Sequence, residues 1–115
     1  MEIPEEFELL SIFESEPQFV DDIKSVPFYY NKTKYRMENV NNQICEIELC
    51  PAYDEFKITV SQNEVTIVYL ELKNIKSLSI IDEKTSRFII TQESSVSKIQ
   101  LKPIFQIFHT EETIH

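Results

Sequence analysis

The sequence predicts an α+β fold in which one short N-terminal helix packs on a mainly antiparallel β-sheet of about six to eight strands. Apolar residues recur with helical spacing only between residues 5 and 14, whereas most later segments alternate with a period of two. The chain also contains 16 isoleucines, 7 valines and 7 threonines among 115 residues, and such β-branched side chains favour strands. An all-β fold is the alternative.

The N-terminal helix is expected over residues 5–14. Apolar side chains from Phe7 to Phe13 return every third or fourth position and form one apolar stripe. Pro4 stands just ahead, where a proline suits the start of a helix. Pro17 marks its end, because the residue before a proline resists helical geometry.

Four segments in the middle of the chain have the pattern of strands. Residues 23–30 alternate around Pro27, which indicates an edge position or a bulge. Residues 45–49 and 56–60 alternate between apolar and polar side chains, so each strand is expected to be half buried. Residues 65–72 are apolar on both faces, which predicts a central strand.

The C-terminal half continues the sheet. Strands are expected over residues 75–81, 88–91 and 96–108. Turns are predicted at residues 61–64 and 82–86, and the first is built with asparagine because the chain has no glycine. Successive strands follow at short spacing without a helical crossover, which predicts antiparallel pairing.

Composition excludes several classes of function. A chain without glycine cannot form a glycine-rich phosphate loop or a dinucleotide-binding fingerprint. The formal net charge of −9 argues against a nucleic-acid or anionic-membrane partner. No apolar run reaches the length of a membrane span, and the acidic N-terminus is unlike a signal peptide, so a cytoplasmic protein is expected. The length fits one domain, residues 1–115.

The cysteines and histidines offer little for nucleophilic catalysis. Cys45 and Cys50 are spaced C-x4-C, unlike the C-x2-C of zinc and redox sites. Each is therefore expected to be a small apolar side chain that fills space in the core, rather than a metal ligand or a disulfide partner. A catalytic triad would have to combine His109 with one of these cysteines. Glu46 and Glu48 flank the first, whereas cysteine activation needs an electropositive setting. We therefore expect no catalytic residue.

Two pairs of adjacent carboxylates, Asp21-Asp22 and Asp54-Glu55, have the chemistry to bind a metal or to act as acid and base. Solvated turn residues are the favoured interpretation, because the alternating ligands and the glycine of a calcium loop are missing. We expect no metal and no cofactor.

The charge is concentrated in the first half of the chain. Residues 1–22 contain eight acidic side chains and residues 37–56 contain five, and neither segment has a basic one. A field of one sign attracts a basic partner and raises the rate of encounter. The alternative is that the acidity only keeps the chain soluble. The candidate partner-binding residues are Glu14, Glu16, Asp21, Asp22, Glu46, Glu48, Asp54 and Glu55.

A tyrosine-rich segment begins at the end of the first predicted strand and continues beyond it. Aromatic and basic residues gather there, a composition that single-stranded nucleic-acid binders also use: Phe28, Tyr29, Tyr30 and Tyr35 surround Lys32, Lys34 and Arg36. The surrounding acidity opposes that function. A strand with an exposed tyrosine face is favoured, and tyrosine is a common anchor in protein interfaces.

The N-terminal third resembles the Immunity protein 50 family, small bacterial proteins of polymorphic toxin systems. The resemblance is carried by residues 10–14 and 17–23, in which Phe13, Pro17, Phe19, Asp21 and Ile23 fall on the family pattern. The sequence departs from that pattern where the family has a glycine (here Glu14) and a histidine (here Val20). The resemblance implies a non-enzymatic protein that binds and neutralises a cognate toxin inside the producing cell.

The sequence as a whole therefore predicts an immunity-type protein that blocks a basic toxin through an acidic face. Many antibacterial toxins act on nucleic acid through a basic cleft, and acidic side chains can take the place of phosphates there. The alternative is a small non-catalytic scaffold or regulatory subunit, including a homodimer joined through a sheet edge. A metal- or carboxylate-dependent enzyme is the third hypothesis, after an immunity protein and a scaffold or regulatory subunit.

Overall fold

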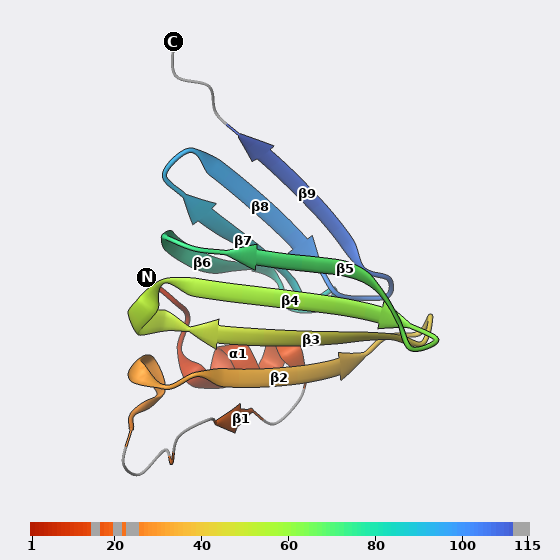
Figure 1. The fold of residues 1–115 in the computed structure, drawn as a ribbon, viewed down its shortest axis with the longest axis horizontal. Coiled ribbons are helices and arrows are strands. Elements are labelled where there is room, and N and C mark those ends of the chain that lie inside the picture. Colours follow the sequence, from red (N-terminus) through yellow and green to blue (C-terminus); the bar gives the residue numbers. More distant parts are fainter. Residues whose placement is uncertain (15–16, 20–21, 23–25, 112–115) are drawn as a thin grey trace.

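The computed structural model describes residues 1–14, 17–19, 22 and 26–111 (Figure 1). Its elements are α1 (Glu6–Phe13), β1 (Gln18–Phe19), η1 (Phe28–Tyr30), β2 (Thr33–Glu38), β3 (Gln43–Cys50), η2 (Pro51–Tyr53), β4 (Glu55–Gln62), β5 (Val65–Leu72), β6 (Ile75–Asp82), β7 (Arg87–Gln92), β8 (Ser95–Gln100) and β9 (Gln106–Glu111). The predicted α+β class and the N-terminal helix are confirmed. The strands divide into two sheets.

Both sheets are meanders in which each strand pairs with its neighbour in sequence. The first has the order β1-β2-β3-β4-β5 and the second the order β6-β7-β8-β9, and all these pairings are antiparallel. A two-residue link, Lys73-Asn74, carries the chain from one sheet to the other. Figure 1 shows the four-stranded sheet beside β5 and α1 behind β2 and β3.

One apolar core is shared by the helix and both sheets. Strands β2, β3 and β4 point every second side chain inward, in the alternation expected of half-buried strands. Leu9, Ile12 and Phe13 of α1 are fully buried against this inner side. From the other sheet, Phe88 and Ile90 of β7 join the same cluster. The opposite side of β2–β5 therefore faces away from the helix.

The turns use left-handed residues other than glycine. Asn63 and Glu64 have φ values of 52° and 64° and form the hairpin turn predicted between β4 and β5. Ser86, with φ 49°, ends the turn predicted at residues 82–86. Asn42 and Asn74 also adopt positive φ. Asparagine tolerates this region better than most residues, which explains three of the seven such positions.

The strand predicted over residues 23–30 is wrong for its described C-terminal part. Residues 23–25 lie outside the described residues, and Phe28–Tyr30 form a single 3-10 turn in which the Tyr30 amide donates to the Pro27 carbonyl at 3.0 Å. Tyr29 and Tyr30 are exposed on this turn, whereas Tyr35 on β2 is only 2% exposed. The predicted strand with an exposed tyrosine face is therefore also wrong.

Two further strand predictions are corrected. Residues 65–72 form β5, which is an edge strand of the first sheet rather than a central one. Its outward side chains Ile67 and Tyr69 are exposed although they are apolar. Residues 96–108 form two strands, because the chain leaves the sheet after Gln100 and re-enters it as β9. Pro103 lies in this break and has no amide hydrogen to continue the ladder.

Candidate functional site

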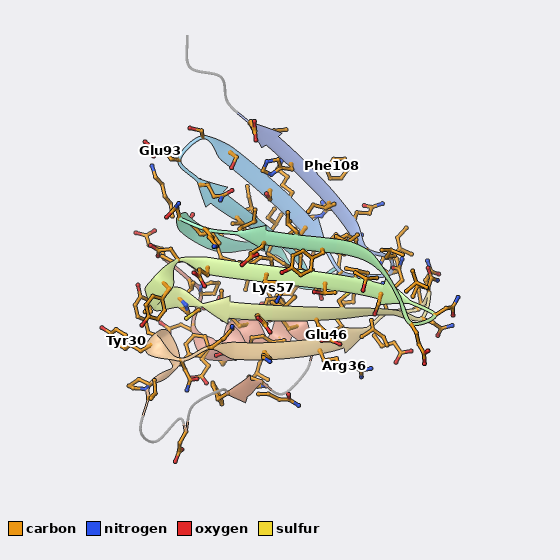
Figure 2. All side chains as sticks on the ribbon, in the orientation of Figure 1. Tyr30, Arg36, Glu46, Lys57, Glu93 and Phe108 are labelled. Atoms are coloured by element: carbon orange, nitrogen blue, oxygen red, sulfur yellow. The ribbon has the colours of Figure 1, made fainter. Side chains whose placement is uncertain are left out.

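The surface of β2–β5 that faces away from α1, called here the outer face, carries the largest share of the predicted binding residues. Strand register arranges its side chains in rows across the sheet. One row contains Lys34, Glu48, Lys57 and Glu71, and the next contains Arg36, Glu46, Thr59 and Tyr69. Figure 2 shows Arg36, Glu46 and Lys57 on this face. Acidic and basic residues therefore alternate across it.

Glu48 lies at the centre of a cluster of lysines. Its carboxylate is 3.5 Å from Lys32 Nζ, 3.4 Å from Lys34 Nζ and 3.8 Å from Lys57 Nζ. Partial burial would raise the pKa of Glu48, but the three ammonium groups outweigh it and hold the pKa below its ordinary value. The charge of this predicted binding residue is thus compensated within the chain.

A shallow hollow of about 310 Å³ lies between these rows. Lys34, Arg36, Glu46, Glu48 and Lys57 contribute its charged lining. At its margin Lys57 Nζ lies 5.3 Å from the centre of the Tyr69 ring, a cation–π contact. Glu48 raises the pKa of Lys57, and Tyr69 adds to this effect.

Glu46 and Glu55 are the two predicted residues that remain exposed on or next to the outer face. Glu46 follows Cys45 on β3 and points outward, and Glu55 begins β4 opposite Cys50. Among the described residues, neither carboxylate has an ion-pair partner. These two side chains are therefore available to a cationic partner.

The remaining predicted residues do not join this group. Glu14 caps the C-terminus of α1 with φ 50° and forms an ion pair with Lys102. Asp54 is 2.5 Å from the amino group of Met1. The Asp22 carbonyl accepts a hydrogen bond from the Val26 amide at 2.7 Å. Glu16 and Asp21 lie outside the described residues. The six described positions thus occupy more than one side of the molecule.

A second arrangement, which sequence reasoning missed, joins three polar residues of β8 and β9. Ser97 Oγ is 2.7 Å from His109 Nδ1, and His109 Nε2 is 3.7 Å from Glu111 Oε1. Ser97 and His109 are cross-strand partners, which the residue types alone do not reveal. Ser97 is fully buried, so its hydroxyl is not accessible to a substrate. It instead provides a hydrogen-bond partner for the His109 ring.

The two cysteines have the character predicted for small apolar fillers. Both are free and buried, and they lie on opposite faces of β3. Burial raises the pKa of the Cys45 thiol to about 11, which keeps it protonated and unreactive. Burial likewise raises the pKa of Cys50.

The described residues contain no group of three metal-ligating side chains placed to hold an ion. In this part of the chain no helix has the length and apolar character to cross a membrane.

Comparisons with known proteins point to a shared fold. No family model and no curated protein sequence matches the chain, so the Immunity protein 50 pattern stays a resemblance carried by residues 10–14 and 17–23. Among solved structures, a chain of a contact-dependent growth inhibition toxin–immunity protein complex from Klebsiella pneumoniae 342 is similar with a TM-score of 0.72. The match covers 95% of each chain at 22% sequence identity, and it shows that the two chains have the same fold.

Proposed function

We propose that this chain is an immunity protein that binds a cognate bacterial toxin and neutralises it by direct protein–protein contact in the cytoplasm. The observation that carries this proposal is the shared fold with a chain of a toxin–immunity protein complex over 95% of both lengths. The independent resemblance of residues 10–14 and 17–23 to an immunity family supports the same function.

The immunity role is favoured over the toxin role by the chemistry of the described residues. A toxin that acts through a nucleophilic side chain or a metal needs that group to be accessible to its substrate. Here Ser97 and Cys45 are fully buried, and burial raises the pKa of the Cys45 thiol. A non-catalytic protein that acts by occupying a surface needs none of these groups.

The outer face is the proposed toxin-binding surface. Glu46 and Glu55 supply exposed negative charge to a basic partner, whereas Arg36 and Tyr69 are residue types enriched in protein interfaces. The lysines around Glu48 give the same surface a mixed charge pattern. Such a pattern favours one complementary partner over cationic proteins in general, since a misplaced partner would meet like charges.

The test is co-expression with the C-terminal domain of the large protein encoded directly upstream. We expect this domain alone to stop growth and the present chain to restore it, with the two proteins purifying as a stable complex. Growth that stays arrested while the chain is folded and abundant would contradict the proposal. A complex without rescue would favour the alternative, a non-catalytic scaffold or regulatory subunit.

A further inference from the structure

We propose that the outer edge of β9 is a self-association site at which a second copy of this chain adds its own β9 in antiparallel orientation. This inference is independent of the toxin-binding proposal, because it uses the other sheet. The two β9 strands would join the four-stranded sheets into one continuous sheet across a two-fold axis.

Of the four sheet edges in the described structure, three are protected. β1 contains only two residues, and β5 is distorted by a register shift opposite Val60 and Ser61. The edge of β6 is covered by Glu2, whose amide donates to the Lys76 carbonyl at 2.9 Å and whose carbonyl accepts from the Leu78 amide at 2.8 Å. Short length, bulges and covering segments are the usual means of preventing strand addition.

β9 has none of these protections. It pairs with β8 in unbroken register over six residues, and no described strand lies beyond it (Figure 1). The segment Gln106–Glu111 contains neither a lysine nor a proline, the residues that commonly block an edge. Its backbone groups on that side are therefore open to a partner strand.

The charge distribution favours contact between two copies through this sheet rather than through the acidic part of the chain. Residues 75–111, which include the whole four-stranded sheet, contain five basic and four acidic side chains. Residues 1–74 contain fifteen acidic and six basic ones. Contact through the acidic part would place two negative surfaces against each other, whereas contact through β9 joins two nearly neutral ones. A self-association surface is therefore best placed on this sheet.

One register fits the side chains of β9. With Phe108 opposite Phe108 of the second copy, Gln106 faces Thr110 and Ile107 faces His109, so five residues of each strand pair. This register keeps the outward faces of both sheets continuous. Phe108 on β9 is 66% exposed (Figure 2). Pairing with its counterpart would form an aromatic cross-strand contact.

A hollow with both polar and apolar lining adjoins the same residue. It measures about 430 Å³ and is lined by Val96, Lys98, Phe108 and Thr110, among others. The second copy would extend the rim of this hollow and bury additional apolar area. Pairing of the two β9 strands by itself buries only a small interface area. The dimer is therefore expected to be concentration-dependent rather than permanent.

The experiment is sedimentation equilibrium of the intact chain up to about 1 mM, a range that covers weak dimers. We expect a monomer–dimer equilibrium, and we expect Phe108→Lys to raise its dissociation constant at least about tenfold, because two lysines would face each other. Tyr69→Lys is the matched control, since it replaces an aromatic residue of similar exposure on the edge strand β5. The control should dimerise like the wild type.

Cysteine cross-linking tests the register itself. Residues that face each other across antiparallel strands have Cβ atoms about 4.5–5.5 Å apart, so Phe108→Cys should form a disulfide-linked dimer under mild oxidation. Gln106→Cys should not, because it faces Thr110 of the second copy.

A wild type that stays monomeric throughout, or a Phe108→Lys variant that dimerises normally, would overturn the proposal. Loss of toxin binding in Phe108→Lys, with no dimer in the wild type, would assign the edge to the toxin instead.

Discussion

Phe13 of the helix meets Phe88 of β7 edge to face, with ring centroids 5.6 Å apart and an interplanar angle of 89°. Both rings are fully buried. Phe88 also contacts Phe56 of β4 at 5.8 Å. A single aromatic ring of the four-stranded sheet thus contacts both the helix and the five-stranded sheet, and it joins the three parts of the fold into one core.

The Phe13–Phe88 contact should be measurable as a coupling energy. Phe13→Leu and Phe88→Leu each leave a small cavity, and their combined effect should be less than the sum, by about 0.5–1.5 kcal/mol. Urea denaturation of the two single variants and the double variant measures this difference. As a control, Phe13→Leu combined with Val65→Ala, an exposed position on β5, should be additive. A coupling energy near zero for the aromatic pair would show that the edge-to-face contact adds nothing beyond the burial of each ring.

The hairpin turn between β4 and β5 offers a stabilising substitution. Glu64 adopts φ 64° in that turn, a conformation that disfavours side chains with a Cβ atom. Glu64→Gly creates an Asn-Gly turn, the sequence preferred in such hairpins, and should raise the free energy of unfolding by about 0.5–1 kcal/mol. Thermal denaturation tests this expectation. Glu93→Gly, at a position without positive φ, should leave stability unchanged or lower it.

Periodicity predicted some of the elements whose faces differ in polarity, but β2 was missed although Thr33, Tyr35 and Met37 alternate there with exposed residues. The helix and strands β3 and β4 alternate between apolar and polar residues, so local sequence is sufficient to identify them. β5 was predicted to be central because both its faces are apolar. The sequence does not show that the chain leaves the sheet at Lys73-Asn74 and starts a second one, since this depends on how the two sheets share a core.

The candidate site, too, could be predicted from the sequence only in part. Alternation on β3 is enough to place Glu46 and Glu48 on one face. The lysines that compensate Glu48 come from β2, β4 and the residue preceding β2, and they meet it only because of the strand register. Register depends on long-range pairing, which a single sequence does not reveal. The same limit explains why the contact between Ser97 and His109 was missed.

Ionised Glu48 should contribute to the free energy of unfolding of this protein, and this contribution should be lost in acid. Three lysines outweigh the effect of partial burial and hold its pKa below 4.5, so as pH falls the unfolded state binds this proton before the folded state does. The stabilisation is complete above the unfolded value and disappears as pH falls through the lower folded value. Glu48→Gln should therefore flatten the pH dependence of the free energy of unfolding below about pH 4.5.

The matched control for that measurement is Glu46→Gln on the same face of β3, which removes a carboxylate without disturbing the lysine cluster. Chemical denaturation across a series of buffers from pH 3 to pH 6 gives both profiles, an interval of about three units around the ordinary glutamate value. If Glu48→Gln retained the acid slope of the wild type, the lysines would not be stabilising the ionised carboxylate.

Charge reversal on the outer face should weaken toxin binding, and the loss should depend on salt. Glu46→Lys combined with Glu55→Lys replaces two exposed negative charges with positive ones on the surface proposed to meet a basic toxin. We expect the dissociation constant to rise at least about tenfold in low salt, mainly through slower association. We also expect the wild-type affinity itself to fall as ionic strength increases.

Stopped-flow association kinetics with the purified toxin domain at several salt concentrations separates the two effects. Glu83→Lys combined with Glu93→Lys, in the connections β6–β7 and β7–β8, changes the net charge by the same amount away from the outer face and should bind normally. Equal losses in both variants would mean that net charge, rather than this face, attracts the toxin. An unchanged affinity in the outer-face variant would place the binding surface elsewhere on the molecule.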